Sequence, residues 1–153
     1  MKGAALGRWR NEQGQVGGIE VLPFGLLVFV AGSLLIANAW AVVDAKLAVT
    51  AAAREATRAY VEAPDAVAAQ HAARARARET LSAYGRGDDG RVDVDVGAEQ
   101  RLVRCARVSI TVTYEVPALT VPFVGGFGGA IHAKATHTEL VDPYRDGLED
   151  GAC

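Results

Sequence analysis

Three side chains of this 153-residue sequence are candidates for chemistry: one carboxylate, Glu20, and two thiols, Cys105 and Cys153. Glu20 stands at the start of a long apolar run, where burying a charged carboxylate costs free energy unless a partner offsets it. Two cysteines are too few for a disulfide framework and lack metal-site spacing. The possibilities are therefore a Cys105–Cys153 bridge, two free thiols, or an intermolecular bond through Cys153.

The remaining polar residues form no recognisable active site. His132 and His137 lie five residues apart on one predicted strand, so they should face opposite sides of a sheet and share no metal ion. The sequence has no nucleophile elbow and no H-E-x-x-H motif, and "GGFGGA" is neither a P-loop nor a dinucleotide fingerprint. We therefore predict a protein that is not an enzyme and has no metal site and no cofactor.

The overall composition narrows the class further. The net charge is −2 and the pI is about 5.9, whereas nucleic-acid binders usually carry a strongly basic face. Half of the residues are apolar but only 7% are aromatic, which predicts a thin, alanine- and valine-rich core. The Ala, Arg, Gly, Val and Asp bias is typical of a GC-rich bacterial genome of the actinobacterial type.

The element that must position Glu20 is the run that follows it. Val21–Val43 is about 23 residues without a charge, enough for a helix to cross the hydrocarbon core of a membrane. The N-terminal flank carries Lys2, Arg8 and Arg10, and cytoplasmic flanks are enriched in such residues. The sequence thus predicts a single-pass protein of the cell membrane, with its N-terminus cytoplasmic and its C-terminal part extracytoplasmic.

Two other fates of this segment are open. Ala37-Asn38-Ala39 is an A-x-A site that a signal peptidase would cut after Ala39, although the apolar stretch is longer than in ordinary secretory signals. That reading leads to the alternative function, a secreted or membrane-anchored small binding module unrelated to pili. A prepilin-type segment, by contrast, would be cut on the cytoplasmic side before the apolar run.

The stretch "QGQVGGIEVLPFGLLVFV" resembles the start of TadE-like proteins, the pseudopilins of tight-adherence (Flp-type) pilus systems. Their start is an Arg- or Lys-flanked Gly-Gln, a few small residues, an acid and a long apolar helix. The positions that match are Arg8, Arg10, Gly14, Gln15 and Glu20. One departure concerns spacing: family members that are cut carry the acid fifth after the cleaved glycine, whereas Glu20 is sixth after Gly14, so that spacing gives a cut before Val16.

The resemblance implies a non-catalytic role in pilus assembly or a cell-surface adhesion apparatus of type IV pilus-like kind. The N-terminal helix would pack against pilins or pilus-assembly platform proteins, as a homo- or hetero-oligomer. Glu20 would pair with the N-terminal amine of a neighbouring subunit inside the membrane. The alternative from physics alone places Glu20 at the headgroup interface, where it favours the positive end of a helix dipole.

The rest of the chain predicts a small α+β domain with an antiparallel sheet, pilin-like in the light of the resemblance. One helix should run from Glu20 to Glu62 and end before Pro64, with Val43, Leu47, Ala51 and Tyr60 on its apolar side. Residues 65–84 read as a second helix that stops at Gly85. The domain boundaries are therefore a cytoplasmic leader at 1–19, a transmembrane helix at 20–43, an α+β domain at 44–141 and an acidic flexible tail at 142–153.

Alternating apolar and polar residues mark the predicted strands. "RVDVDVG" and "RVSITVTYEVP" place valines and other apolar residues on one face, and "AIHAKATHTELV", residues 130–141, predicts a third strand. The same parity assigns Cys105 to the polar side of the main strand. The intervening "PALTVPFVGGFGGA" reads as an apolar, glycine-rich connection, in which Phe123, Val124 and Phe127 are either exposed or tucked under the sheet.

Overall fold

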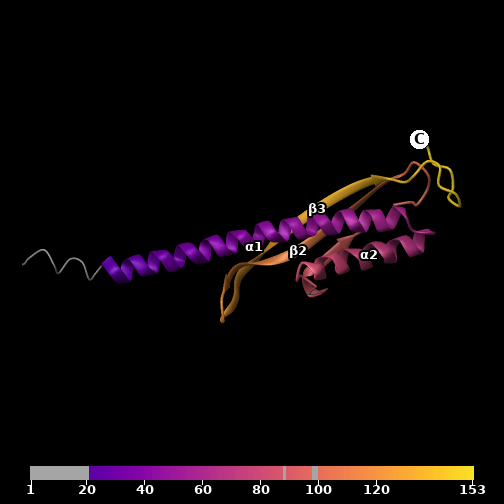
Figure 1. Cartoon of the computed structure of the whole chain (residues 1–153). Helices are drawn as coiled ribbons and strands as arrows, with labels where there is room; N and C mark the ends of the chain where they lie inside the picture. The colour runs from indigo at the N-terminus through magenta and orange to yellow at the C-terminus, as the bar shows by residue number, and fades with distance from the viewer. Residues whose placement is uncertain (1–20, 88, 98–99) are drawn as a thin grey trace, which may run out of the picture. The chain divides into compact units, whose positions relative to one another are not determined.

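The computed structural model describes residues 21–87, 89–97 and 100–153. Within them, two α-helices, one short 3-10 helix and three strands follow in the order α1, α2, η2, β1, β2, β3 (Figure 1). The chain divides into two compact units, residues 1–36 and residues 37–153. The predicted leader, including Gly14, Gln15 and Val16, and the acid Glu20 lie outside the described residues.

Helix α1, Val21–Val61, has the length that the sequence predicts. In its first part, Val21–Ile36, every residue is exposed except Leu34, which is partly buried. A soluble surface helix would show a polar stripe, and this segment has none. The helix is long and apolar enough to cross a membrane, and its most apolar window is not buried at all within the protein.

In the second unit, α1 changes character and buries a face made mainly of alanine. Its fully buried side chains there are Ala45, Ala48, Val49, Ala52, Ala53, Ala56, Thr57 and Tyr60. The predicted apolar side is wrong for Val43 and Leu47, which remain 50% and 59% exposed. The buried face consists mostly of small side chains, and the larger Val43 and Leu47 lie on the exposed side of the helix.

Helix α2, Ala66–Ala83, begins and ends where the sequence predicts a helix. The Asp65 carboxylate accepts hydrogen bonds from the backbone N–H groups of Val67 (2.9 Å) and Ala68 (2.8 Å), which caps the helix N-terminus. At the other end Gly85 adopts a φ of 70°, and the Arg86 N–H donates to the carbonyl of Leu81. The buried face is again small: Ala69, Ala73, Ala77 and Leu81.

The sheet is antiparallel with the order β1-β2-β3, formed by β1 (Val92–Asp95, after η2, Asp89–Arg91), β2 (Arg107–Val121) and β3 (Gly125–Leu140). The predicted alternation is confirmed in β2, whose buried residues are Val108, Ile110, Val112, Tyr114 and Val116. Both helices contribute their alanine faces to the same core as this strand face. The result is a two-layer α+β unit.

The predicted connection between the second and third strands is instead the end of one long hairpin. β2 continues to Val121 and β3 starts at Gly125, with Val121 paired to Gly125. Pro117 lacks an N–H, and the ladder accommodates it with a register shift between Pro117 and Leu119. Gly126 is required there because a Cβ would lie 2.8 Å from the Pro117 side chain. The sequence alone suggested that proline and glycine end these strands. Both strands instead continue through them.

Candidate functional site

The two cysteines are joined. The structure contains a Cys105–Cys153 disulfide with its Cα atoms 5.1 Å apart. The strand parity used for Cys105 does not apply, because β2 begins only at Arg107 and Cys105 lies in a turn with a φ of 61°. A left-handed turn directs its thiol toward the chain end instead of along the polar strand face.

The residues after Leu140 make defined contacts besides the disulfide. Arg104 donates from Nη1 to the carboxylate of Asp150 (2.7 Å) and from Nε to the carbonyl of Arg145 (2.9 Å). Arg145 reaches the C-terminal end of α1, where its guanidinium donates to the carbonyls of Val61, Glu62 (2.8 Å) and Ala63 (2.5 Å). These carbonyls have no partner within the helix, so a forked cation satisfies them and complements the helix dipole.

A second cluster gathers around Arg86, in the connection that follows α2. Its Nη2 lies 2.6 Å from Oδ2 of Asp44 and 3.2 Å from the carbonyl of Ala41, both on α1. The guanidinium carbon also stands 5.2 Å from the centroid of the Tyr114 ring on β2. The Arg86 side chain is only 15% exposed, and its Nε has no hydrogen-bond partner among the described residues. Arg86 thus joins α1 to the sheet immediately after the apolar run.

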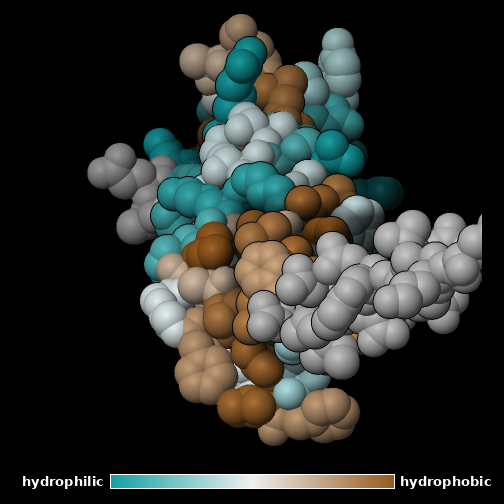
Figure 2. Space-filling model, turned by 90° about the vertical axis from the view of Figure 1, so that its left-hand side faces the viewer, coloured by the Kyte–Doolittle hydropathy of each residue, from teal (hydrophilic) through white to brown (hydrophobic). Residues whose placement is uncertain are grey.

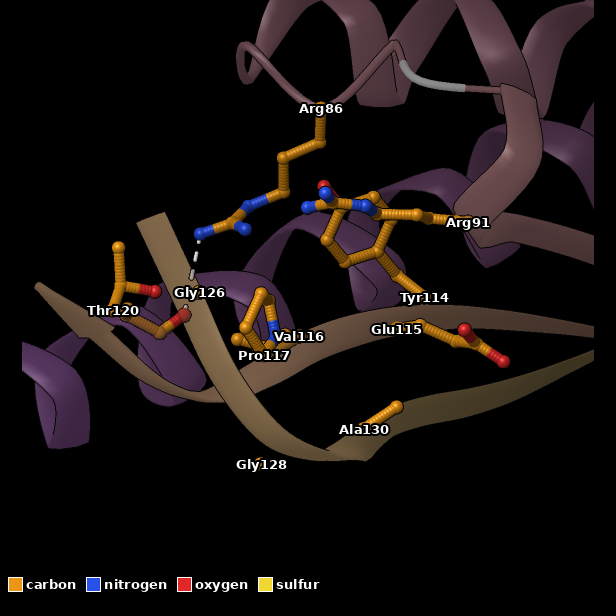
Figure 3. Close-up of a pocket in the computed structure, with 11 residues that line it drawn as sticks. Arg86, Arg91, Tyr114, Glu115, Val116, Pro117, Thr120, Gly126, Gly128 and Ala130 are labelled. Atoms are coloured by element: carbon orange, nitrogen blue, oxygen red, sulfur yellow. Dashed lines mark hydrogen bonds between the residues drawn. The ribbon is translucent and has the colours of Figure 1, made fainter. Parts of the chain in front are cut away.

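An open pocket of about 530 Å³ lies beside this cluster. Figure 3 shows the Arg86 side chain pointing toward the hairpin near Gly126, and the Arg91 side chain extending across the Tyr114 ring toward Arg86. Among the described residues that line it, one is an acid, Glu115, and none is Cys or His. The lining thus lacks the thiol or imidazole of a nucleophile–base pair.

Asn38, the one strongly polar side chain of the apolar run, has a specific partner on the hairpin. Its Nδ2 donates to the carbonyl of Thr120 (3.1 Å), and its Oδ1 accepts from the Thr120 N–H (2.5 Å). β1 pairs with β2 between Thr111 and Tyr114, so none of the strands that the structure describes lies beside the outer edge of β2 at Thr120. The Asn38 amide replaces that missing strand and satisfies both backbone groups.

The histidines behave as their spacing predicts. His132 is exposed, with Nδ1 3.8 Å from a carboxylate oxygen of Glu115, whereas His137 is partly buried on the other face of β3. Across the described ranges, no group of three or more His, Cys, Asp or Glu side chains is placed to hold a metal ion.

Tyr60 is a fully buried titratable side chain of the core. Burial raises the pKa of its phenol, which donates a hydrogen bond to the carbonyl of Gln100 (3.2 Å).

Sequence reasoning did not identify the roles of Arg86, Arg145 and Asn38. Arg86 belongs to an Arg-Gly-Asp tripeptide that is common by chance, and only its position after the Gly85 stop distinguishes it. Arg145 stands in a stretch whose composition suggests flexibility. Asn38 gave one signal, a lone amide in an apolar run. Comparisons with protein-family models, curated proteins and solved structures found no match to the chain.

Proposed function

We propose that this chain is a membrane-anchored, TadE-like pseudopilin with a non-catalytic role in pilus assembly. The observation that carries the proposal is the difference in burial between the two parts of α1. Its first part presents an apolar surface whose most apolar window is not buried, and its second part forms a wall of the α+β core. A single helix that is both anchor and core element is the arrangement that the pilin resemblance implies.

The anchor role follows from the cost of leaving α1 in water. Its exposed side chains include Leu22, Phe24, Leu26, Leu27, Phe29, Leu35 and Ile36, each at least 64% accessible. Burial of a large apolar side chain is worth roughly 1.5 to 3 kcal/mol, so the segment gains many kcal/mol by entering lipid.

Retention of this segment is favoured over removal as a secretory signal. Cleavage after Ala39 would cut α1 inside its helical span and remove Asn38, which satisfies the backbone of Thr120. A cut before Val16, in contrast, would leave α1 whole. The proposal therefore favours an anchor that stays joined to the domain.

The orientation rests on charge and on redox chemistry. Lys2, Arg8 and Arg10 favour a cytoplasmic N-terminus. The opposite side would then be an oxidising compartment, in which a Cys105–Cys153 bridge persists. In this setting Glu20 would lie at the cytoplasmic end of the span and pair with the amine of an adjacent subunit.

The test uses the full chain in a piliated host that lacks its own copy. Alkaline phosphatase fused after Cys153 should be active, and the fusion should resist extraction from membranes by alkaline carbonate. Glu20→Gln should leave the protein in the membrane but lower the number of pili, because a neutral amide cannot form the ion pair. Glu12→Gln is the matched control and should leave piliation unchanged.

Three results would argue against the proposal. An inactive phosphatase rejects the orientation. Unchanged piliation in the Glu20→Gln strain rejects the pairing role and favours an acid that merely sits at the headgroups. A mature protein that begins at Trp40, measured by mass spectrometry, supports the secreted binding module instead.

A further inference from the structure

The closed end of the β2–β3 hairpin is apolar and exposed. Phe123 at the turn is fully exposed, Val124 is 67% exposed, and Leu119 and Phe127 are 42% and 48% exposed. No charged side chain occurs from Val116 to Ile131. Figure 2 shows this end of the molecule, at the bottom of the view, covered with hydrophobic side chains. Exposed apolar side chains gathered at one tip indicate a surface that contacts something other than water.

The hairpin is held at a defined level of α1. Two hydrogen bonds of the Asn38 amide go to the backbone of Thr120, close to the turn. Asn38 precedes Val43, the end of the apolar run, by five residues, which is about 7.5 Å of helix rise. The first charged residue of α1 after the run is Asp44, which pairs with Arg86.

From this register we propose that the hairpin end is a lipid-contacting wedge that enters the leaflet on the side of the α+β domain. The inference rests on the proposed anchoring of α1. If the span ends near Val43, then Thr120 lies below the membrane surface by about the 5 to 10 Å at which interfacial elements insert. Phe123, Val124 and Phe127 would place their side chains among the upper parts of the acyl chains.

The backbone chemistry of the hairpin fits that depth. Polar backbone groups in lipid must be paired, and the ladder pairs Leu119 with Phe127, Thr120 with Gly126 and Val121 with Gly125. The Asn38 amide satisfies the outer edge of β2 at Thr120. Placing an asparagine side chain in a membrane-spanning run costs free energy. The contact between Asn38 and Thr120 would offset that cost and would also satisfy the backbone groups of Thr120 in lipid.

A lipid contact is favoured over a protein partner because α1 also exposes apolar side chains close to the residue that holds the hairpin. Trp40 and Val43 of α1 are 70% and 50% exposed there. Tryptophan is enriched at membrane interfaces. A protein groove would have to cover the helix and the hairpin end together, whereas a membrane receives both without a matching shape.

The experiment measures fluorescence quenching of single tryptophans by brominated phosphatidylcholine in vesicles that contain the full-length protein. One variant keeps only Trp40 (Trp9→Phe). Two more lack both native tryptophans and carry Phe123→Trp or Tyr144→Trp. Tyr144, which is 92% exposed and lies outside the hairpin, is the matched control. Because Phe123 is fully exposed, tryptophan there disturbs no packing, and Val124→Trp repeats the measurement.

We expect Trp at 123 to be quenched about as strongly as Trp40 by bromines near the top of the acyl chains, and less by bromines at their middle. Its emission should shift to shorter wavelength, while Trp at 144 remains unquenched. If Trp40 is quenched but Trp at 123 behaves like Trp at 144, the wedge is wrong and the anchor stands. A blue shift at 123 without quenching means that a protein surface covers the tip, which also overturns the wedge. No quenching at Trp40 would reject the anchor itself.

Discussion

Arg86 Nη2 stands 2.6 Å from Asp44 Oδ2, and this pair ties the segment after α2 to α1 just beyond the end of the apolar run. We predict that Arg86→Met lowers the free energy of unfolding by roughly 1 to 3 kcal/mol, because it leaves the Asp44 carboxylate without its charged donor. Thermal unfolding of the full chain in detergent, followed by near-UV circular dichroism, measures the loss.

Arg101→Met is the control for that measurement. Arg101 pairs with Glu149 at 3.4 Å, but the two side chains are 75% and 80% exposed. An exposed ion pair of this kind contributes less than about 1 kcal/mol. Equal losses in the two variants would show that the partial burial of Arg86 has no energetic consequence.

The disulfide gives a second prediction. Cys105 and Cys153 are separated by 48 residues, and closing a loop of that length stabilises a fold by roughly 4 kcal/mol in the chain-entropy account. Cys105→Ser, Cys153→Ser and the double variant should therefore show similar losses of stability, each up to that size. Peptide mapping without reduction should find the two cysteines in one linked species. Alkylation of both thiols in unreduced protein would contradict the prediction.

The raised pKa of Tyr60 predicts how the free energy of unfolding changes at alkaline pH. Because burial raises the pKa of Tyr60 in the folded state, the folded protein keeps the phenol proton at pH values where the unfolded chain has lost it. Its contribution to stability is complete below the unfolded pKa of about 10 and declines as pH rises above that value. Tyr60→Phe should reduce this decline, at the cost of about 1 kcal/mol at neutral pH for the lost hydrogen bond to Gln100.

Tyr144→Phe controls for the alkaline titration of other groups, since Tyr144 is 92% exposed. The comparison requires chemical unfolding of the three proteins at neutral pH and at several values above 10. An unchanged alkaline decline in Tyr60→Phe would mean that another group dominates it.

The alanine faces predict a strong dependence on side-chain size. Ala73 is fully buried on α2, whereas Ala75 on the same helix is exposed. Ala73→Leu should destabilise the protein by roughly 1 to 3 kcal/mol because the core has no room for the added carbons. Ala75→Leu has the same change in composition and nearly the same helix propensity, so it should be close to neutral. Comparable melting temperatures for the two variants would show that the core is loosely packed.

Local signals in the sequence were sufficient for most of the fold. Asp65 and Gly85 bracket α2, and the valines, Ile110 and Tyr114 alternate along β2 as a half-buried strand requires. These features depend on residues a few positions apart. The hairpin end was missed because Pro117 and the glycines usually stop strands, and only the pairing with β3 reveals that a bulge accommodates them.

The candidate site was less predictable because its contacts join distant residues. Arg86 finds Asp44 across 42 positions, Asn38 finds Thr120 across 82, and Arg145 finds the end of α1 across a similar distance. No periodicity or spacing encodes such pairs. The roles of Arg86 and Asn38 therefore become visible only when the fold shows which residues they contact.

The alanine face of α1 has a consequence for how the chain is made. Synthesis completes Val21–Val61 before any of β2, Arg107–Val121, has left the ribosome, so this helix must wait for most of its core. Alanine has the highest helix propensity and the smallest apolar side chain, which lets the nascent helix form early while exposing little that aggregates. A leucine-rich face would bury more apolar area in the folded protein, but it would expose a larger apolar surface until β2 is synthesised.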